Sequence, residues 1–236
     1  MDWAFFAHTY WCMFHRVYDN LIPQSVVEDV AQEIQNVNID WHWKRDTIGT
    51  DFQFTDPRIV ETPQFIHTIY PETGHSPRRL LPMVKGIVNA VCRASSMDIV
   101  QVIRIKANLI PQHAEFDPSW YHTPHCDISV DSPDVPEDLR DKYALSLIYY
   151  PVDCDGVTRI FDTFLNNLTD SAECTEAIQS ARCMDEIAAK QGRCVLLPSS
   201  LLHASSPPRE NQRRMVINTV FFSTRGLNPQ LNVKAE

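Results

Sequence analysis

The feature that most constrains the fold is a period-two alternation of apolar and polar residues in the second half of the chain. Apolar residues stand at positions 103, 105, 107 and 109, and polar residues stand at 104, 106 and 108. Successive side chains of a β-strand point to opposite faces, so this pattern predicts a strand over residues 100–109. One face of that strand is expected to be buried, and the other to be solvated or turned into a cavity.

Further segments of the same half have the composition of strands, being rich in β-branched or aromatic residues and bounded by Pro, Gly, Asp or Ser. They are residues 143–151, 157–161, 193–197 and 215–223. A helix is expected over Cys174–Lys190, ended by Gly192. Several strands joined by short turns, without alternating helices, predict an antiparallel sandwich or barrel and argue against a Rossmann-type sheet.

Residues 1–97 are expected to form a mostly helical layer packed on this β-rich core, which spans residues 98–236, within a single structural domain. The segment Ser25-Val26-Val27-Glu28 matches a capping box and begins a predicted helix with apolar residues at helical spacing. A second helix is expected to open with Ser76 as its cap and Pro77 at its first position. Neither helix carries an evident chemical group.

Composition narrows the functional classes. The chain has 236 residues, 44% of them hydrophobic, and a formal net charge of −9. The acidic balance argues against a general binder of nucleic-acid backbones, although it leaves room for a local basic pocket. No apolar run approaches 18 residues, so no transmembrane helix is expected. The first residues lack the basic region and the apolar run of a secretory signal.

The cysteines are scattered and odd in number, and no two are spaced as Cys-x-x-Cys. This pattern disfavours both a zinc ribbon and a disulfide framework. Free thiols in a reducing compartment are expected instead, which predicts a cytoplasmic location. The seven cysteines stand at positions 12, 92, 126, 154, 174, 183 and 194.

The segment His125-Cys126-Asp127 carries the main chemical signal. If it is extended, the side chains of His125 and Asp127 lie on one face and can bind adjacent positions of one metal, while Cys126 points away. The natural third ligand is His203, which follows the predicted strand 193–197. Two histidines and one carboxylate on one face of an octahedron leave three positions open, as in non-haem Fe(II) oxygenases.

An arginine opens the last predicted strand, where Arg213 and Arg214 precede Met215. A guanidinium group can hold a carboxylate through two parallel charge-assisted hydrogen bonds. An arginine at this place therefore suits a dicarboxylate cosubstrate.

Together these segments resemble the Fe(II)/2-oxoglutarate-dependent oxygenases, specifically the prolyl-hydroxylase-like group with bacterial and phage members. The resemblance covers about residues 99–224, and the family often has a Gly-Gly pair where this chain has Asp155-Gly156. The matching segments, in the family's order, are His125-Cys126-Asp127, residues 147–151, residues 156–161, Gly192-Arg193, residues 196–199 leading into His203, and Arg214.

The resemblance implies a mainly β fold with α support (α+β), a double-stranded β-helix or jelly-roll barrel flanked by the N-terminal helices. It implies a dioxygenase that uses Fe(II), 2-oxoglutarate and O2 to hydroxylate a substrate, with release of succinate and CO2. By position, His125, Asp127 and His203 would hold the iron. Arg214, helped by the hydroxyl of Tyr150, would bind the distal carboxylate of 2-oxoglutarate.

Two of these assignments depend on strand register. A shift of one residue exchanges the two faces of a strand, so Arg213 would replace Arg214 and Tyr149 would replace Tyr150. The tyrosines could equally serve cross-strand packing.

Other residues near the motif have two interpretations each. His122 could replace His125 as a ligand, but its odd spacing from Asp127 puts it on the opposite face of a strand, where it would contact substrate or support a ligand. His113 could contact substrate or be a solvated surface residue, and Asn108 could contact cosubstrate or a neighbouring strand. The acidic, Pro-rich stretch 131–138 could be a lid or a solvated loop.

The substrate is not fixed by these patterns, because pocket loops set specificity; a peptidyl proline and a small metabolite are both expected classes. Two other functions are possible interpretations: one uses the same three metal ligands, and the other needs no metal. One is another metal-dependent enzyme on the same barrel, a cupin-type dioxygenase or a zinc hydrolase. The other is a degenerate barrel that only binds. Neither a membrane nor nucleic acid in general is expected as a partner, and the oligomeric state is left open.

Overall fold

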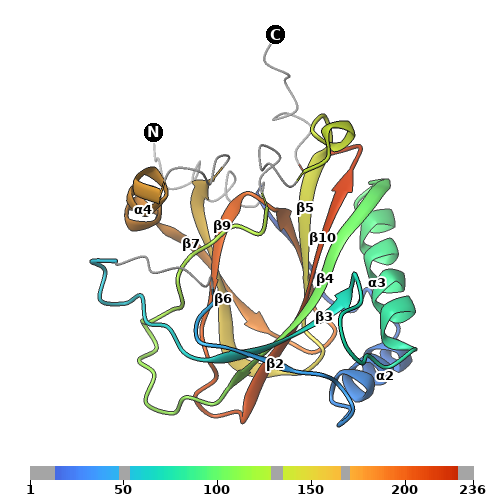
Figure 1. Cartoon of the computed structure of the whole chain (residues 1–236), viewed down its shortest axis with the longest axis horizontal. Coiled ribbons are helices and arrows are strands. Elements are labelled where there is room, and N and C mark those ends of the chain that lie inside the picture. The colour runs from blue at the N-terminus through green and yellow to red at the C-terminus, as the bar shows by residue number, and fades with distance from the viewer. Residues whose placement is uncertain (1–13, 48–53, 129–134, 166–170, 228–236) are drawn as a thin grey trace.

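Two antiparallel sheets face each other in the computed structural model, which describes residues 14–47, 54–128, 135–165 and 171–227 (Figure 1). In these residues the larger sheet has the strand order β1-β8-β5-β10-β4-β3-β2, and the smaller sheet has the order β7-β6-β9. The strands are β1 (Arg16–Tyr18), β2 (His42–Lys44), β3 (Gln64–Tyr70), β4 (Ile99–Pro111), β5 (Tyr143–Tyr149), β6 (Cys154–Phe164), β7 (Cys183–Ala189), β8 (Cys194–Pro198), β9 (Leu201–Ser205) and β10 (Arg213–Ser223).

Strand alternation divides the larger sheet into an outer and an inner face. β10 pairs with both β4 and β5, and it places Ile217 and Phe221 in an outer apolar cluster. Val216 belongs instead to a second apolar cluster between the two sheets, and Asn218 points the same way. Residues two apart on a strand share a face, so the even-numbered side chains of β10 line the interior.

Two helices cover the outer face of the larger sheet, α2 (Gln24–Ile34) and α3 (Leu80–Ala94) (Figure 1). Their apolar stripes and the outward side chains of β4, β5 and β10 form one buried cluster. This packing leaves the inner face of the sheet free to carry polar side chains. A shorter helix, α4 (Ser171–Ser180), lies beside the smaller sheet, and a 3-10 turn spans Glu137–Leu139.

The predicted strands are confirmed, and so is the mainly β fold class with helical support. The segments expected at 100–109, 143–151, 157–161, 193–197 and 215–223 correspond to β4, β5, β6, β8 and β10. The alternating strand is longer than expected, because pairing with β10 continues to Pro111.

The expected helix starts are wrong in detail. α2 begins at Gln24 with Pro23 as its cap and without a side-chain cap, so Ser25 lies inside the first turn and forms no capping box. The carbonyl oxygen of Pro23 accepts from the backbone N–H groups of Val26 and Val27, which closes that turn. α3 begins at Leu80, later than the expected start at Ser76.

The expectation of a mostly helical N-terminal layer omitted three strands. β1 pairs with β8 at one edge of the larger sheet, while β3 pairs with β4 and β2 extends the other edge. β1 and β2 have three residues each, too few to show an alternation. The boundary at residue 97 falls between α3 and β4, and the division into layers stays a prediction.

The expected helix over residues 174–190 is wrong in its second half. α4 ends at Ser180, and Cys183–Ala189 is the edge strand β7, paired with β6. Its composition favours a helix, since Met, Glu and Ala are good helix formers. Asp185 and Glu186 are exposed along this edge, which leaves no regular strand alternation to detect.

Six of the cysteines lie in the described residues, and all six are free thiols. In the same part of the chain, helices that combine the length and apolar character needed to cross a membrane are absent. The cytoplasmic location stays a prediction.

Ile105 tests the outer core, because it is 0% exposed between the larger sheet and the helices. Replacement by Ala leaves a cavity there, and we expect Ile105→Ala to lower the free energy of unfolding by about 2–5 kcal/mol in chemical denaturation. Val37→Ala is the control, since Val37 is 94% exposed; its effect should stay within about 0.5 kcal/mol. Equal effects of the two variants would contradict this packing.

Candidate metal centre

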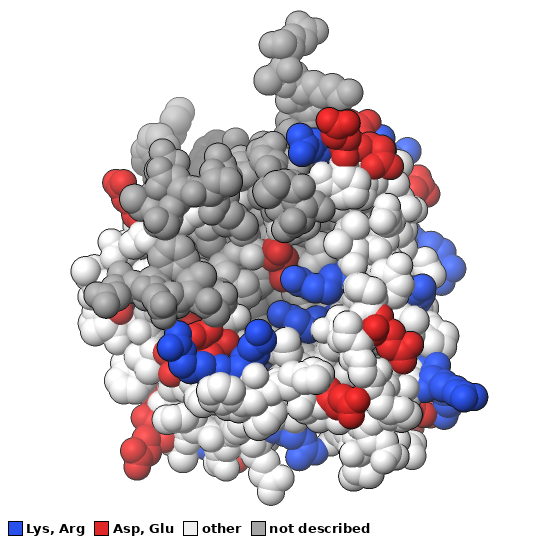
Figure 2. Space-filling model, viewed as in Figure 1, with Lys and Arg blue, Asp and Glu red and all other residues white. Residues whose placement is uncertain are grey.

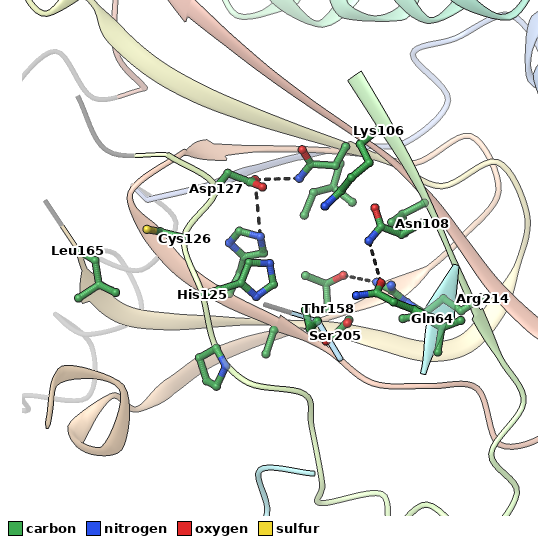
Figure 3. A pocket seen from close by; sticks show the side chains of 18 of the residues that line it. Gln64, Lys106, Asn108, His125, Cys126, Asp127, Thr158, Leu165, Ser205 and Arg214 are labelled. Carbon is green, nitrogen blue, oxygen red and sulfur yellow. Dashed lines mark hydrogen bonds and ion pairs between the residues drawn. The ribbon is translucent and has the colours of Figure 1, made fainter. Parts of the chain in front are cut away.

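Three side chains converge between the two sheets. The donor atoms of His125, Asp127 and His203 all lie within 4.8 Å of one another (Figure 3). His203 stands on β9, and His125 forms an isolated antiparallel bridge with it. Each of the two residues donates its backbone N–H to the other's carbonyl oxygen at 3.0 Å. This bridge sets the two imidazoles side by side, with ring centroids 4.7 Å apart.

Both imidazoles are held in one tautomer. Nδ1 of His125 lies 3.1 Å from the carbonyl oxygen of Thr123, and Nδ1 of His203 lies 3.0 Å from that of Leu201. A carbonyl oxygen can only accept, so each Nδ1 carries the proton. Because Nδ1 of each ring is used in this hydrogen bond, Nε2 is the nitrogen left to bind a metal, as in metal sites where a backbone carbonyl orients the ligand.

The carboxylate of Asp127 is fixed by three donors. Arg104 donates to Oδ1 at 2.8 Å, while Ser146 and Asn218 donate to Oδ2 at 2.7 and 2.8 Å. A carboxylate offers about four lone-pair positions, so one remains for a cation. Asp127 is almost fully buried, with 5% of its side chain exposed.

The charge states also suit a metal. Burial lowers the pKa of His125 to about 4, with His203 adding to the effect, so the ring is neutral at physiological pH. Burial alone would raise the pKa of Asp127, but His203 and Arg104 hold it well below its ordinary value. Two imidazoles and one ionised carboxylate are a donor set that fits Fe(II).

The metal-ligand candidates open into a cavity of about 450 Å³. Its wall combines apolar side chains, such as Ile148 and Val216, with polar ones from β4 and β10. The sulfur of Cys126 points away from the cluster, as the alternation predicted (Figure 3). A concave site of this size is typical of small-molecule binding.

Arg214 lies in the same cavity, although only 2% of the residue is exposed. It donates from Nη2 to Oγ1 of Thr158 at 2.6 Å and weakly from Nε to the carbonyl oxygen of Gly156 at 3.4 Å. A Cβ added at Gly156 would lie 2.7 Å from the carbonyl oxygen of Ser206 and 2.9 Å from Cδ of Arg214, so a larger residue there would displace its neighbours. Arg213 points to the opposite side and donates to Gln35.

The two tyrosines are separated in the same way. The hydroxyl of Tyr150 donates to Oγ1 of Thr158 at 2.6 Å, and the Arg214 guanidinium lies 5.8 Å from the Tyr150 ring centroid. Tyr149 belongs to the outer apolar cluster, where burial raises its pKa and its hydroxyl has no hydrogen-bond partner in the described residues. The structure thus brings Tyr150, and not Tyr149, to Arg214.

His122 lies outside the metal cluster. Its ring is buried between Oγ1 of Thr62, at 2.8 Å from Nε2, and Oγ of Ser205, at 3.0 Å from Nδ1. Burial lowers its pKa to about 4, against the opposing effect of Glu61.

Of the other residues considered in the sequence, one lines the cavity and one lies on the surface. His113 is exposed and packs its ring against Phe116. Asn108 lines the cavity and donates to Gln64 at 2.9 Å. Residues 131–134 of the acidic stretch lie outside the described part of the chain.

Sequence reasoning missed the side chains that hold Asp127. The polar alternation put Arg104 on a strand face expected to be solvated or turned into a cavity, and no pattern pointed to Asn218 as a partner of Asp127. Their contacts with the carboxylate join residues 23 and 91 positions apart. Only the register of β4, β10 and β5 brings these donors to one carboxylate. The polar alternation was the available signal. It indicated which face of the strand Arg104 occupies, but it could not indicate that Asp127 is its partner.

Comparisons with known proteins add the fold relationship. Neither a family model nor a curated protein matches the sequence. Among solved structures, a prolyl hydroxylase from Trichoplax adhaerens, in complex with a peptide fragment of the oxygen degradation domain of hypoxia inducible factor, is 14% identical with a TM-score of 0.54. That match covers 92% of this chain and 86% of the other. The chain has the fold of the 2-oxoglutarate-dependent oxygenases.

Two further structures have the same relationship to the chain. The non-heme alpha ketoglutarate dependent epimerase SnoN from nogalamycin biosynthesis is 13% identical with a TM-score of 0.55, over 98% of this chain and 90% of its own. HygX from Streptomyces hygroscopicus, with nickel and 2-oxoglutarate bound, is 13% identical with a TM-score of 0.54, over 91% and 85%. The oxygenase resemblance predicted from the sequence is therefore confirmed for the double-stranded β-helix.

The buried His122 makes a prediction about acid stability. The pKa of His122 falls from an ordinary value of 6.5 to about 4 on folding, so between these values the unfolded chain binds more protons and acid favours unfolding. One proton bound only by the unfolded chain lowers the free energy of unfolding by up to about 1.4 kcal/mol for each unit by which the pH falls. In urea denaturation of the metal-free proteins, the free energy of unfolding should fall less between pH 7 and pH 5 for His122→Gln than for the wild type. An unchanged pH dependence would contradict the buried neutral ring.

Proposed function

We propose that this chain is an Fe(II)- and 2-oxoglutarate-dependent oxygenase that hydroxylates a small molecule or a peptide. The observation that carries the proposal is the pairing, in one cavity, of the His125–Asp127–His203 cluster with a buried arginine. Arg214 has no carboxylate within ion-pair distance in the described residues. A buried guanidinium without an anion is costly, so the cavity is suited to a ligand that brings one.

In this proposal the metal is held by Nε2 of His125, Nε2 of His203 and the carboxylate of Asp127. Arg214 binds the distal carboxylate of 2-oxoglutarate, and the Tyr150 hydroxyl supports it through Thr158, which accepts from both side chains. The chemistry that Fe(II), 2-oxoglutarate and O2 supply when bound is hydroxylation of a substrate C–H bond, coupled to oxidative decarboxylation of 2-oxoglutarate to succinate and CO2.

The protein's own part is orientation, charge and exclusion of water. The carbonyl oxygens of Thr123 and Leu201 fix the imidazoles, and Arg104, Ser146 and Asn218 keep the aspartate ionised and immobile. Rigid ligands of this kind hold open coordination positions for substrates. The apolar wall of the cavity limits access of water to the reacting atoms.

A zinc hydrolase on the same three ligands is less well supported, because hydrolysis gives no reason to bury an arginine without an anion in the same cavity. The solved structures of the same fold point the same way, since HygX binds 2-oxoglutarate and the Trichoplax enzyme is a prolyl hydroxylase. A barrel that has lost its metal would have no reason to keep three fixed and correctly protonated donors.

The direct test is anaerobic titration with Fe(II) and then 2-oxoglutarate. We expect a weak visible charge-transfer band that needs both ligands, and we expect Asp127→Ala to abolish it by removing the anionic donor. Circular dichroism and the melting temperature of the variant show whether it is folded. A wild-type protein that binds Fe(II) and 2-oxoglutarate without a band, or neither of them, would refute the proposal.

The adjacent arginines form a matched pair for the cosubstrate site. Arg214→Met should weaken 2-oxoglutarate binding at least tenfold in the same titration, since one charge-assisted contact contributes about 1.5–3 kcal/mol. Arg213→Met removes the same charge from the next residue, on the opposite face, and should leave the affinity within twofold. A larger loss of 2-oxoglutarate affinity in Arg213→Met than in Arg214→Met would contradict the assignment of Arg214 to the cosubstrate.

A further inference from the structure

The cavity has the opposite charge to the protein as a whole. The chain carries a formal net charge of −9. Within the described residues, however, the cavity is lined by the cations Arg104, Lys106 and Arg214 and by a single carboxylate, Asp127. Figure 2 shows basic side chains gathered along the hollow at the centre of this face. A positive pocket in an acidic protein selects ligands by charge.

The proposed cofactors do not neutralise this charge. The two positive charges of Fe(II), the charge of Arg214, the carboxylate of Asp127 and the two carboxylates of 2-oxoglutarate cancel. Arg104 and Lys106 are then left without a compensating charge in the complex. The substrate, which binds after the two cofactors, can supply this compensating negative charge. This inference rests on the proposed function, because the charge balance includes both cofactors.

Lys106 is the less constrained of the two cations. It stands on the inner face of β4, opposite Asn218, and its ammonium group points into the cavity (Figure 3). Arg104 is bound to Asp127, whereas Lys106 has no ion pair in the part of the chain described. Burial, together with Arg104 and Lys44, lowers the pKa of Lys106 to about 8, against the attraction of Asp127. A cation destabilised in this way gains from binding an anion.

The cavity also holds polar atoms without partners. Among buried side-chain atoms of the described residues, those lacking a hydrogen bond include Nε of Arg104, Oγ1 of Thr47 and Oδ1 of both Asn108 and Asn218. All four residues line this cavity. Buried polar groups are normally paired, so a cluster of unpaired ones indicates a polar ligand. It must offer an acceptor to the arginine and N–H or O–H groups to the amides.

This subsite is separate from the one assigned to the distal carboxylate of 2-oxoglutarate. Lys106 pairs with Asn218, which is four residues from Arg214 on β10. At the rise of an antiparallel strand, that separation is about 13 Å. Lys106 is instead level with Asp127, whose carboxylate accepts from Asn218. An anion at Lys106 therefore lies beside the metal centre, where a substrate would be.

We propose that the substrate is a small anionic molecule, one that carries a carboxylate or phosphate together with N–H or O–H groups. Lys106 and Arg104 bind the anionic group, and the amides of Asn108 and Asn218 accept from the donors. Lys106 is thus a specificity-determining residue. A cavity of about 450 Å³ suits a small molecule beside 2-oxoglutarate.

The test uses protein loaded anaerobically with Fe(II) and 2-oxoglutarate, titrated with acetate and with methyl phosphate as probes of the two kinds of anion. Both the charge-transfer band and the melting temperature are measured. We expect a saturable response to at least one probe in the wild type. Lys106→Met should weaken it at least tenfold, while leaving the affinity for 2-oxoglutarate within threefold. Lys142→Met, at a lysine paired with Asp141, is the control and should leave both affinities within twofold.

Lys106→Met also separates a binding role from a structural one. The variant keeps the length of the side chain and removes repulsion from Arg104 and Lys44, so its melting temperature without ligands should equal or exceed that of the wild type. A marked drop would assign Lys106 to the fold and overturn the proposal.

Three further results would also overturn it. They are no saturable response of the wild type to either probe, an unchanged response in Lys106→Met, and a tenfold loss of 2-oxoglutarate affinity in that variant, which would assign Lys106 to the cosubstrate. If the band never forms in the wild type, the proposed function fails instead. Calorimetric titration of the metal-free proteins with the same probes then decides on the anion site by itself.

Discussion

The site depends on the antiparallel bridge between His125 and His203. Two backbone hydrogen bonds join a loop residue to β9, and they bring the two imidazoles side by side. Asp127 follows two residues later, and its backbone N–H donates to the carbonyl oxygen of Ser199, in the turn between β8 and β9. The three donors, two from one loop and the third from β9, are thus brought together by backbone contacts.

The polar interior is stabilised from outside. α2 and α3 pack on one face of the larger sheet, so the stability of the domain comes largely from that outer cluster. The inner face can then carry Arg104, Lys106 and Arg214, which contribute little to folding and are costly to bury. Under the proposed function these charges serve ligands, so stability and binding would be divided between the two faces of one sheet.

Local patterns predicted much of this arrangement. Alternation predicted β4, the resemblance favoured Arg214 over Arg213 at the start of β10, and the spacing of His125 and Asp127 predicted their common direction. Contacts that depend on register between strands were out of reach, as with Arg104 and Asp127. β7 was mistaken for a helix because an exposed edge strand buries too few residues to show a period of two.

The central claim is that one metal ion is shared by the three donors. Its most direct test is a crystal structure of the protein grown anaerobically with Fe(II) and 2-oxoglutarate, with anomalous scattering measured at the iron edge. The account predicts a single strong iron peak within coordination distance of Nε2 of His125, Nε2 of His203 and a carboxylate oxygen of Asp127. An iron peak bound elsewhere, or a cavity whose three donors bind no metal under these conditions, would contradict it.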